Sequence, residues 1–185
     1  MSQCEFGKTS LVYLSHIVGG GELKIDPYKV SVIVKWEMPK SVTKVRSFLG
    51  SSQYWRKFIS NFSSIAAPLH ALTSMKVVFQ WGGKQQKAFD DLKEKINSAP
   101  ILALPDLKQP FEIQTDASDY AMGAALLHHG KPISFHSDIF NGVFINYPTY
   151  DKELYTLVKS VKKCKHYLMG KETIIHTDHK PFQYL

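Results

Sequence analysis

Three acidic residues occupy positions from which they could act together on a phosphate ester. Asp116 ends an alternating apolar run, 111–116, Asp178 ends a second run, 173–178, and Glu153 lies near the start of a helical pattern between them. If the two runs are neighbouring strands, their ends open into one cleft, and the helix can bring Glu153 over the sheet edge. Clustered carboxylates repel one another, so these hard oxygen ligands indicate Mg²⁺ or Mn²⁺ rather than zinc.

Metal-dependent nuclease chemistry is one interpretation of this set. Two ions about 3.5 to 4 Å apart suit phosphodiester hydrolysis, because one activates water and the other stabilises the leaving oxygen. The alternative is that Asp116, Glu153 and Asp178 are separate caps or turn residues, and spacing alone does not decide between the two. A phosphotransferase with an Asp nucleophile ranks lowest, since it needs Asp-x-Asp, whereas Ala117 and Ser118 follow Asp116.

The elements that must position these carboxylates form the second half of the chain. Strands are predicted at 111–116, 121–127 and 131–135, with a turn at Gly130, and a last strand at 173–178. Between them a helix after Tyr147 ends at Gly170, and its predicted apolar face consists of Leu154, Leu157, Val158, Val161 and Leu168. The order β-β-β-α-β predicts an α/β (α+β) fold with a mixed sheet.

The first half is predicted to be mainly helical. A hairpin is expected at 11–21, and Asp26-Pro27 begins a helix that reaches Trp36. Ser41 is the N-cap of a second helix, and Ala88, Phe89, Leu92 and Ile96 share the apolar face of a third. Three prolines then mark a connector, so we predict a boundary near Ala99, with domains at 1–98 and 99–185.

The block Tyr54-Trp55-Arg56-Lys57 alternates ring and cationic side chains. Such a block can stack on bases and contact phosphates, which makes Tyr54, Trp55, Arg56 and Lys57 candidates for nucleic-acid binding. The competing interpretation, which we favour from the sequence, is that the aromatic rings fill a helix core while the cations face water.

Composition sets broad limits on function. The chain has 23 Lys and Arg against 16 Asp and Glu, a net charge of +7, which suits a polyanionic partner without establishing one. No apolar run has the length to cross a bilayer and no secretion signal begins the sequence, so we expect an intracellular protein without a membrane partner. Cys4 and Cys164 lack zinc-site spacing and are expected to be free thiols.

Several blocks, in order along nearly the whole chain, closely resemble the gypsy-type long-terminal-repeat retrotransposon polyprotein. Those similar to the C-terminal (connection) region of its reverse transcriptase are Ser47-Phe48-Leu49-Gly50, Tyr54 to Ile59, Ala66-Ala67-Pro68-Leu69, Trp81, Ala88-Phe89, Leu92-Lys93 and Ala99-Pro100-Ile101-Leu102. Those similar to the first three ribonuclease H motifs are Thr115-Asp116-Ala117-Ser118, Asn146 to Leu154 and Thr177-Asp178-His179-Lys180. The resemblance therefore implies a thumb/connection segment followed by a ribonuclease H-like domain.

This resemblance implies a specific activity. Asp116, Glu153 and Asp178 would be the catalytic residues and would bind Mg²⁺, or Mn²⁺, with Asp116 as the bridging ligand. The RNA strand of an RNA·DNA hybrid would be hydrolysed endonucleolytically, and the hybrid would be recognised by its shape and 2′-hydroxyls. The parent enzyme would also carry RNA-directed DNA polymerase activity.

Two departures from the family pattern limit what carries over. The polymerase motif Tyr-x-Asp-Asp does not occur in this sequence, so polymerisation is expected only of the parent polyprotein. The family's fourth carboxylate and later elements would follow Leu185, so we expect a C-terminally truncated domain. The second function class is therefore a catalytically inactive, nucleic-acid-binding remnant.

Overall fold

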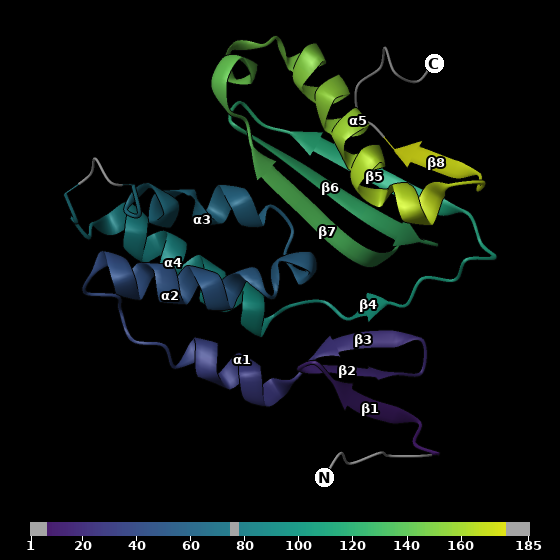
Figure 1. The fold of residues 1–185 in the computed structure, drawn as a ribbon, viewed down its shortest axis with the longest axis horizontal. Coiled ribbons are helices and arrows are strands. Elements are labelled where there is room, and N and C mark those ends of the chain that lie inside the picture. The colour runs from purple at the N-terminus through teal and green to yellow at the C-terminus, as the bar shows by residue number, and fades with distance from the viewer. Residues whose placement is uncertain (1–6, 75–77, 177–185) are drawn as a thin grey trace.

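A computed structural model describes residues 7–74 and 78–176 of the chain. It contains two four-stranded sheets with helices between and beside them (Figure 1). The first sheet has the order β1-β2-β3-β4 and is antiparallel. Its strands are β1 (Ser10–Tyr13), β2 (His16–Gly19), β3 (Glu22–Ile25) and β4 (Leu102–Ala103). The predicted hairpin is thus part of a larger sheet, whose fourth strand comes from beyond position 99.

The helices of the first half begin where the sequence signals predict. Helix α1 (Pro27–Val34) has Asp26 as its N-cap, whose carboxylate accepts a hydrogen bond from Tyr28 N at 2.9 Å. Helix α2 (Val42–Gln53) is capped by Ser41, and α4 (Gly83–Asn97) buries the four predicted apolar residues. These three predictions are confirmed.

Two short elements between α2 and α4 were not predicted. They are the 3₁₀ turn η1 (Arg56–Phe58) and helix α3 (Phe62–Ala71), which contains Pro68. Helix α3 packs against α4 on one side and against strand β7 of the second sheet on the other. The apolar side chains of these helices form the first core, to which Leu102 of β4 also belongs.

The second sheet has the order β7-β6-β5-β8. Strands β5, β6 and β7 form an antiparallel meander, and β8 returns parallel to β5. The bounds are β5 (Phe111–Ala117), β6 (Ala121–His128), β7 (Lys131–Ile139) and β8 (Thr173–His176), with the 3₁₀ turn η2 (Gly142–Asn146) and helix α5 (Thr149–Leu168) between β7 and β8. The predicted β-β-β-α-β order and mixed sheet are confirmed.

The predicted apolar face of α5 is partly wrong. The buried positions of this helix are polar, Lys152, Thr156 and Ser160, while Val158 is 44% exposed. The hydroxyls of Thr156 and Ser160 each donate to the backbone carbonyl four residues earlier, at 2.7 Å, and so can be buried without an unmet hydrogen bond. The spacing of apolar residues cannot reveal these buried positions, because polar residues such as Lys, Thr and Ser are assigned to the solvent-facing side of a helix.

Within the described ranges, no helix combines the length and apolar character needed to span a bilayer.

Candidate active site

Asp116 lies near the end of β5, opposite Gly123 of β6. Phe111 and Ile113 of the same strand are buried in the core beneath α5, and strand alternation assigns Asp116 to the other face of the sheet. Its side chain is exposed. Asp116 can therefore share a ligand with a residue of α5 only around the end of the strand, not through the core.

A side chain from the first half also contacts the sheet at Gly123, the residue that pairs with Asp116 and lies on the same face. A Cβ atom added at Gly123 would clash with Oδ1 of Asn61, so the carboxamide of Asn61 covers the backbone of β6 at this point. Asn61 precedes α3 and has a positive φ of 56°. Asn61 was not predicted to be a site residue. The only sign of its position in the sequence is the small residue Gly123 in strand β6, which Asn61 covers.

Glu153 lies in the second turn of α5, which packs along β5. Its Oε2 atom is buried. The preceding residue, Lys152, is only 7% exposed, and its ammonium group donates to the carbonyl oxygen of Asp119 at 2.8 Å. Because Asp119 follows Asp116 by three residues, this hydrogen bond ties the turn that carries Glu153 to the segment that leaves Asp116.

An aromatic cluster supports the same end of α5. Tyr155 packs against Phe140 and Phe144, with ring centroids 6.1 and 4.2 Å apart. The ammonium group of Lys152 lies 5.9 Å from the centre of the Phe140 ring. The segment that includes η2 therefore packs on the first turns of α5, and the long side chain of Lys152 runs past it towards Asp119.

Asp178, the third predicted carboxylate, lies outside the described residues. The parallel pairing of β5 with β8 runs from Phe111 opposite Thr173 to Gln114 opposite His176. In the sequence, Asp116 and Asp178 each follow the last of these pairs by two residues. A hydrogen bond of 2.8 Å between His176 and Glu112 joins the two strands beside that pair, and it lowers the pKa of Glu112.

The donor set matches a hard divalent cation in type. Asp116 and Glu153 offer carboxylate oxygens, which Mg²⁺ and Mn²⁺ prefer. Over residues 7–74 and 78–176, no group of three or more His, Cys, Asp or Glu side chains is placed to hold a metal ion. Two of the three predicted ligands thus belong to elements that pack together, and the third falls outside this search.

The aromatic-basic block has both buried and accessible members. Trp55 is buried, and its ring packs on His16 and Phe58. Tyr54 is exposed, although its ring contacts those of His16 and Trp55, and it donates its hydroxyl proton to the carbonyl of Leu14. Lys57 is half-buried. The buried Trp55 fits the core interpretation for that residue, and nucleic-acid binding by the block stays a prediction.

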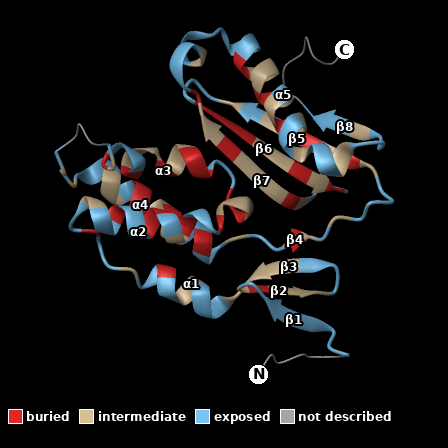
Figure 2. Ribbon diagram, viewed as in Figure 1, coloured by how far each residue is buried: buried red, intermediate tan, exposed pale blue. Residues whose placement is uncertain are grey.

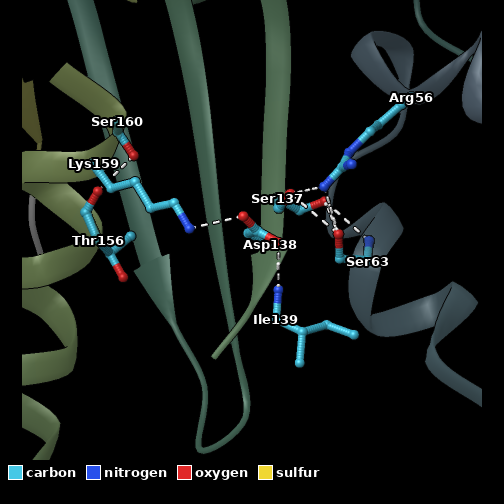
Figure 3. Close-up of polar contacts among 8 residues, drawn as sticks. All are labelled: Arg56, Ser63, Ser137, Asp138, Ile139, Thr156, Lys159 and Ser160. Carbon is cyan, nitrogen blue, oxygen red and sulfur yellow. Dashed lines mark hydrogen bonds and ion pairs between the residues drawn. The ribbon is translucent and has the colours of Figure 1, made fainter. Parts of the chain in front are cut away.

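Strand β7 joins the two halves of the molecule through adjacent residues that point in opposite directions (Figure 3). On one side, the hydroxyl of Ser137 accepts from the backbone N of Ser63 at 3.0 Å, and the carbonyl of Ser137 accepts from Arg56. On the other side, Asp138 pairs with Lys159 of α5 at 2.7 Å. Burial raises the pKa of Asp138, but the hydrogen bond and charge of Lys159 outweigh it, so the pKa is lowered.

Comparison with known families gives a match over the second half of the chain. The sequence model of the RNase H-like domain found in reverse transcriptase matches residues 81–175. Over its whole length the chain is 38% identical to the retrovirus-related Pol polyprotein from transposon 297 of Drosophila melanogaster. Over 97% of its length it is 36% identical to the Pol polyprotein from transposon gypsy of the same organism and 30% identical to the transposon Tf2-3 polyprotein of Schizosaccharomyces pombe.

These relatives are much longer than this chain. The chain spans 18%, 19% and 14% of their respective lengths, about a fifth or less. Among solved structures, it resembles the foamy viral protease-reverse transcriptase in complex with dsDNA, with a TM-score of 0.83 and 20% identity over 96% of this chain and 38% of that one. The same viral protein in complex with RNA/DNA hybrid gives a TM-score of 0.81 and 20% identity over 95% and 25%. At this identity the likeness establishes the fold.

Proposed function

Because this chain belongs to the family of RNase H-like domains found in reverse transcriptase, we propose that it hydrolyses the RNA strand of RNA·DNA hybrids within a retrotransposon polyprotein. The observation that carries the proposal is the contact of Lys152 with the carbonyl of Asp119. That contact holds the helix turn bearing Glu153 against the segment that leaves Asp116. In this proposal, two carboxylates from distant parts of the sequence would act at one end of the sheet.

Asp116, Glu153 and Asp178 would hold Mg²⁺ or Mn²⁺. When bound, the ion would supply the activation of a water molecule and the stabilisation of charge on the leaving oxygen. The chain itself contributes position: exposed Asp116 leaves room for a phosphodiester, and Glu153 is fixed on a packed helix. The ammonium group of Lys152 donates to the backbone carbonyl of Asp119.

The proposed substrate is an RNA·DNA hybrid. Structurally similar reverse transcriptases are described in complex with RNA/DNA hybrid and with dsDNA. The net charge of +7 suits a nucleic acid, because contacts with phosphates supply most of the sequence-independent affinity. The proposed partners in the polyprotein are the polymerase palm and the remainder of the ribonuclease H domain, and the Pol polyprotein of transposon 297, of which this chain spans 18%, is long enough to hold both.

Cleavage of a labelled hybrid by the full 185-residue chain tests this function. The assay compares Mg²⁺, Mn²⁺ and chelator, and compares the wild type with Asp116→Asn and Glu153→Gln. Each variant is expected to lower the rate by more than about a hundredfold, since even the outer partners of a metal ligand are worth about 10- to 100-fold. Asp151→Asn removes the same charge from the same helix two residues away, and is expected to leave the rate nearly unchanged.

The same assay separates the second candidate function. If the folded chain binds the hybrid but does not cleave it with either metal, the protein is a nucleic-acid-binding remnant rather than a nuclease. The positive net charge is the observation that favours this alternative. Circular dichroism of each variant confirms that a lost activity does not come from unfolding.

A further inference from the structure

A cleft outside the carboxylate site opens at β7, the edge strand of the second sheet. Its volume is about 450 Å³, and its walls come from both halves of the molecule. The first half contributes residues around η1, including Tyr54 and Lys57. The second half contributes β7, the last turns of α5 and apolar residues of β5 and β6. The cleft is therefore the place where the aromatic-basic block meets the RNase H-like fold.

The charge of this cleft is uniformly positive or neutral. Arg56, Lys57 and Lys163 line it together with His136 and His166, and no Asp or Glu lies among its described lining residues. Asp138 is near enough to act on His136, but its carboxylate is bound by Lys159. No carboxylate within these walls neutralises the cations, so an anionic ligand is what the cleft can accommodate.

The cations also influence one another in this partly desolvated space. Burial lowers the pKa of Lys57. For His136, burial lowers the pKa first and the charges of Arg56 and Lys163 lower it further, against the smaller effect of Asp138. A bound phosphate would offset both the lost hydration and the mutual repulsion.

The shape of the cationic set suits a strand of nucleic acid better than a small anion. The charges come from three separate elements, η1, β7 and α5, so they belong to more than one wall of the cleft. Tyr54 adds an aromatic residue that is 46% exposed, with its ring packed on His16 and Trp55 and its hydroxyl bonded to the carbonyl of Leu14. Backbone-tracking cations beside an aromatic ring are the usual elements of sequence-independent nucleic-acid binding.

Helix α5 contributes residues both to this cleft and to the candidate carboxylate site, so the distance between them can be estimated along the helix axis. Lys163 follows Glu153 by ten residues, which is about 15 Å along a helix. Phosphates of one strand repeat about every 3.4 Å along a duplex axis, so this separation corresponds to about four nucleotides. We propose that the cleft binds the sugar-phosphate backbone of the substrate about four nucleotides from the scissile bond. This placement relative to the bond rests on the proposed function, while the binding itself does not.

Hybrid binding in the presence of chelator tests the inference without any cleavage. Fluorescence anisotropy of a labelled RNA·DNA hybrid is measured over a range of salt concentrations with the full chain. The double variant Lys57→Gln, Lys163→Gln is expected to weaken affinity about tenfold and to reduce the slope of log K against log salt by about two. Arg56 is left intact, because its hydrogen bond to the carbonyl of Ser137 is structural.

A matched pair of lysines outside the cleft provides the control. Lys44→Gln, Lys162→Gln removes the same net charge from α2 and α5, and neither residue lines the cleft. Equal weakening in the two double variants would show a general charge effect and overturn the inference, as would a cleft variant with unchanged affinity. Displacement of the hybrid by inorganic phosphate at matched ionic strength would also overturn it, since that result indicates a small-anion site.

The two proposals fail in different ways. Asp116→Asn is expected to abolish cleavage while leaving hybrid affinity in chelator intact, whereas the cleft variant is expected to raise KM with little change in kcat. A chain that binds through the cleft but never cleaves would retain this binding site and refute the nuclease function. A folded chain that does not bind the hybrid at all would refute the cleft.

Discussion

The two halves of the molecule bury their interiors differently. Among the described residues, the first core cluster contains sixteen buried apolar side chains, drawn mainly from the helices, whereas the second cluster contains four, Phe111, Ile113, Leu126 and Ile133. Ala121, Met122 and Phe140 of the second half are buried outside both clusters. Figure 2 shows buried segments in red along α2, α3 and α4 and along β6 and β7. The first half thus depends on apolar area, which contributes about 25 cal/mol per Å² and has no preferred direction. The second half has much less of this stabilisation.

Directional polar contacts take a larger part in the second half. The buried face of α5 carries Lys152, Thr156 and Ser160, each with a hydrogen-bond acceptor, and Lys159 pairs with Asp138 of β7. Such contacts add modest net free energy, but they fix orientation. The half that bears the candidate carboxylates therefore relies more on contacts that fix the orientation of its elements, and we expect it to have the smaller free energy of unfolding.

The largest expected effect comes from Phe111→Ala. This ring is fully buried, stacks on His128 at 4.3 Å and packs on Tyr167, so its loss is expected to cost about 3 to 5 kcal/mol. Because this core cluster has only four members among the described residues, we expect the backbone amide protons of β5, β6 and β7 to exchange faster, as measured by hydrogen-exchange mass spectrometry. Phe48→Ala, an equally buried ring in the first core, is the control.

The contrast between the two variants tests whether the cores differ in reserve. Phe48→Ala is expected to leave the second sheet protected and the first core folded, since fifteen buried neighbours remain in the described part of that core. If both variants instead melt the whole chain in one transition, the two cores form a single cooperative unit, and the comparison fails.

Local signals in the sequence predicted much of this architecture. The caps at Asp26 and Ser41 and the apolar face of α4 were readable because each depends on residues within one or two turns. Helix α3 was missed because it begins after Asn61 without a side-chain cap and contains Pro68, which usually ends a helix. Strand β4 was missed because its pairing with β3 joins residues about eighty positions apart.

In the candidate site, too, the features that depend on local sequence were predicted, and those that depend on contacts between distant residues were not. Asp116 and Glu153 were identified from strand ends, helix period and motif resemblance, all of which are local in sequence. The contact of Lys152 with Asp119 spans 33 positions, and a lysine in a helix pattern is normally assigned to solvent. Only the folded structure shows that its ammonium reaches a backbone carbonyl, so this contact was not predicted.

A smaller effect on stability, with a clear effect on activity, is expected from Lys152→Met. Methionine keeps most of the buried stem, but the charge-assisted hydrogen bond to Asp119 is lost at a cost of about 1 to 3 kcal/mol. Glu153 would then be held less well, so kcat for hybrid cleavage should fall about tenfold with KM unchanged. Lys162→Met, an exposed position on the same helix, is the control, and equal kcat in the two variants would contradict a positioning role for Lys152.

The smallest expected effect concerns the ion pair of Asp138 with Lys159, both of which are partly exposed. The pKa of Asp138 is lowered in the folded state, so the ionised carboxylate adds stability at neutral pH, and this contribution disappears as pH falls below about 3.9 and through the folded pKa. Solvent screening limits it to about 0.2 to 1 kcal/mol.

Urea unfolding of the wild type and Asp138→Asn measures this contribution. Asparagine retains the oxygen that accepts from Ile139 N, so the substitution removes mainly the charge. The difference in unfolding free energy between the two proteins is expected at neutral pH and should vanish in acid, whereas a difference independent of pH would assign the loss to packing. A value well below that of Lys152→Met would show that the buried contact of α5, and not its exposed ion pair, compensates for the small apolar core.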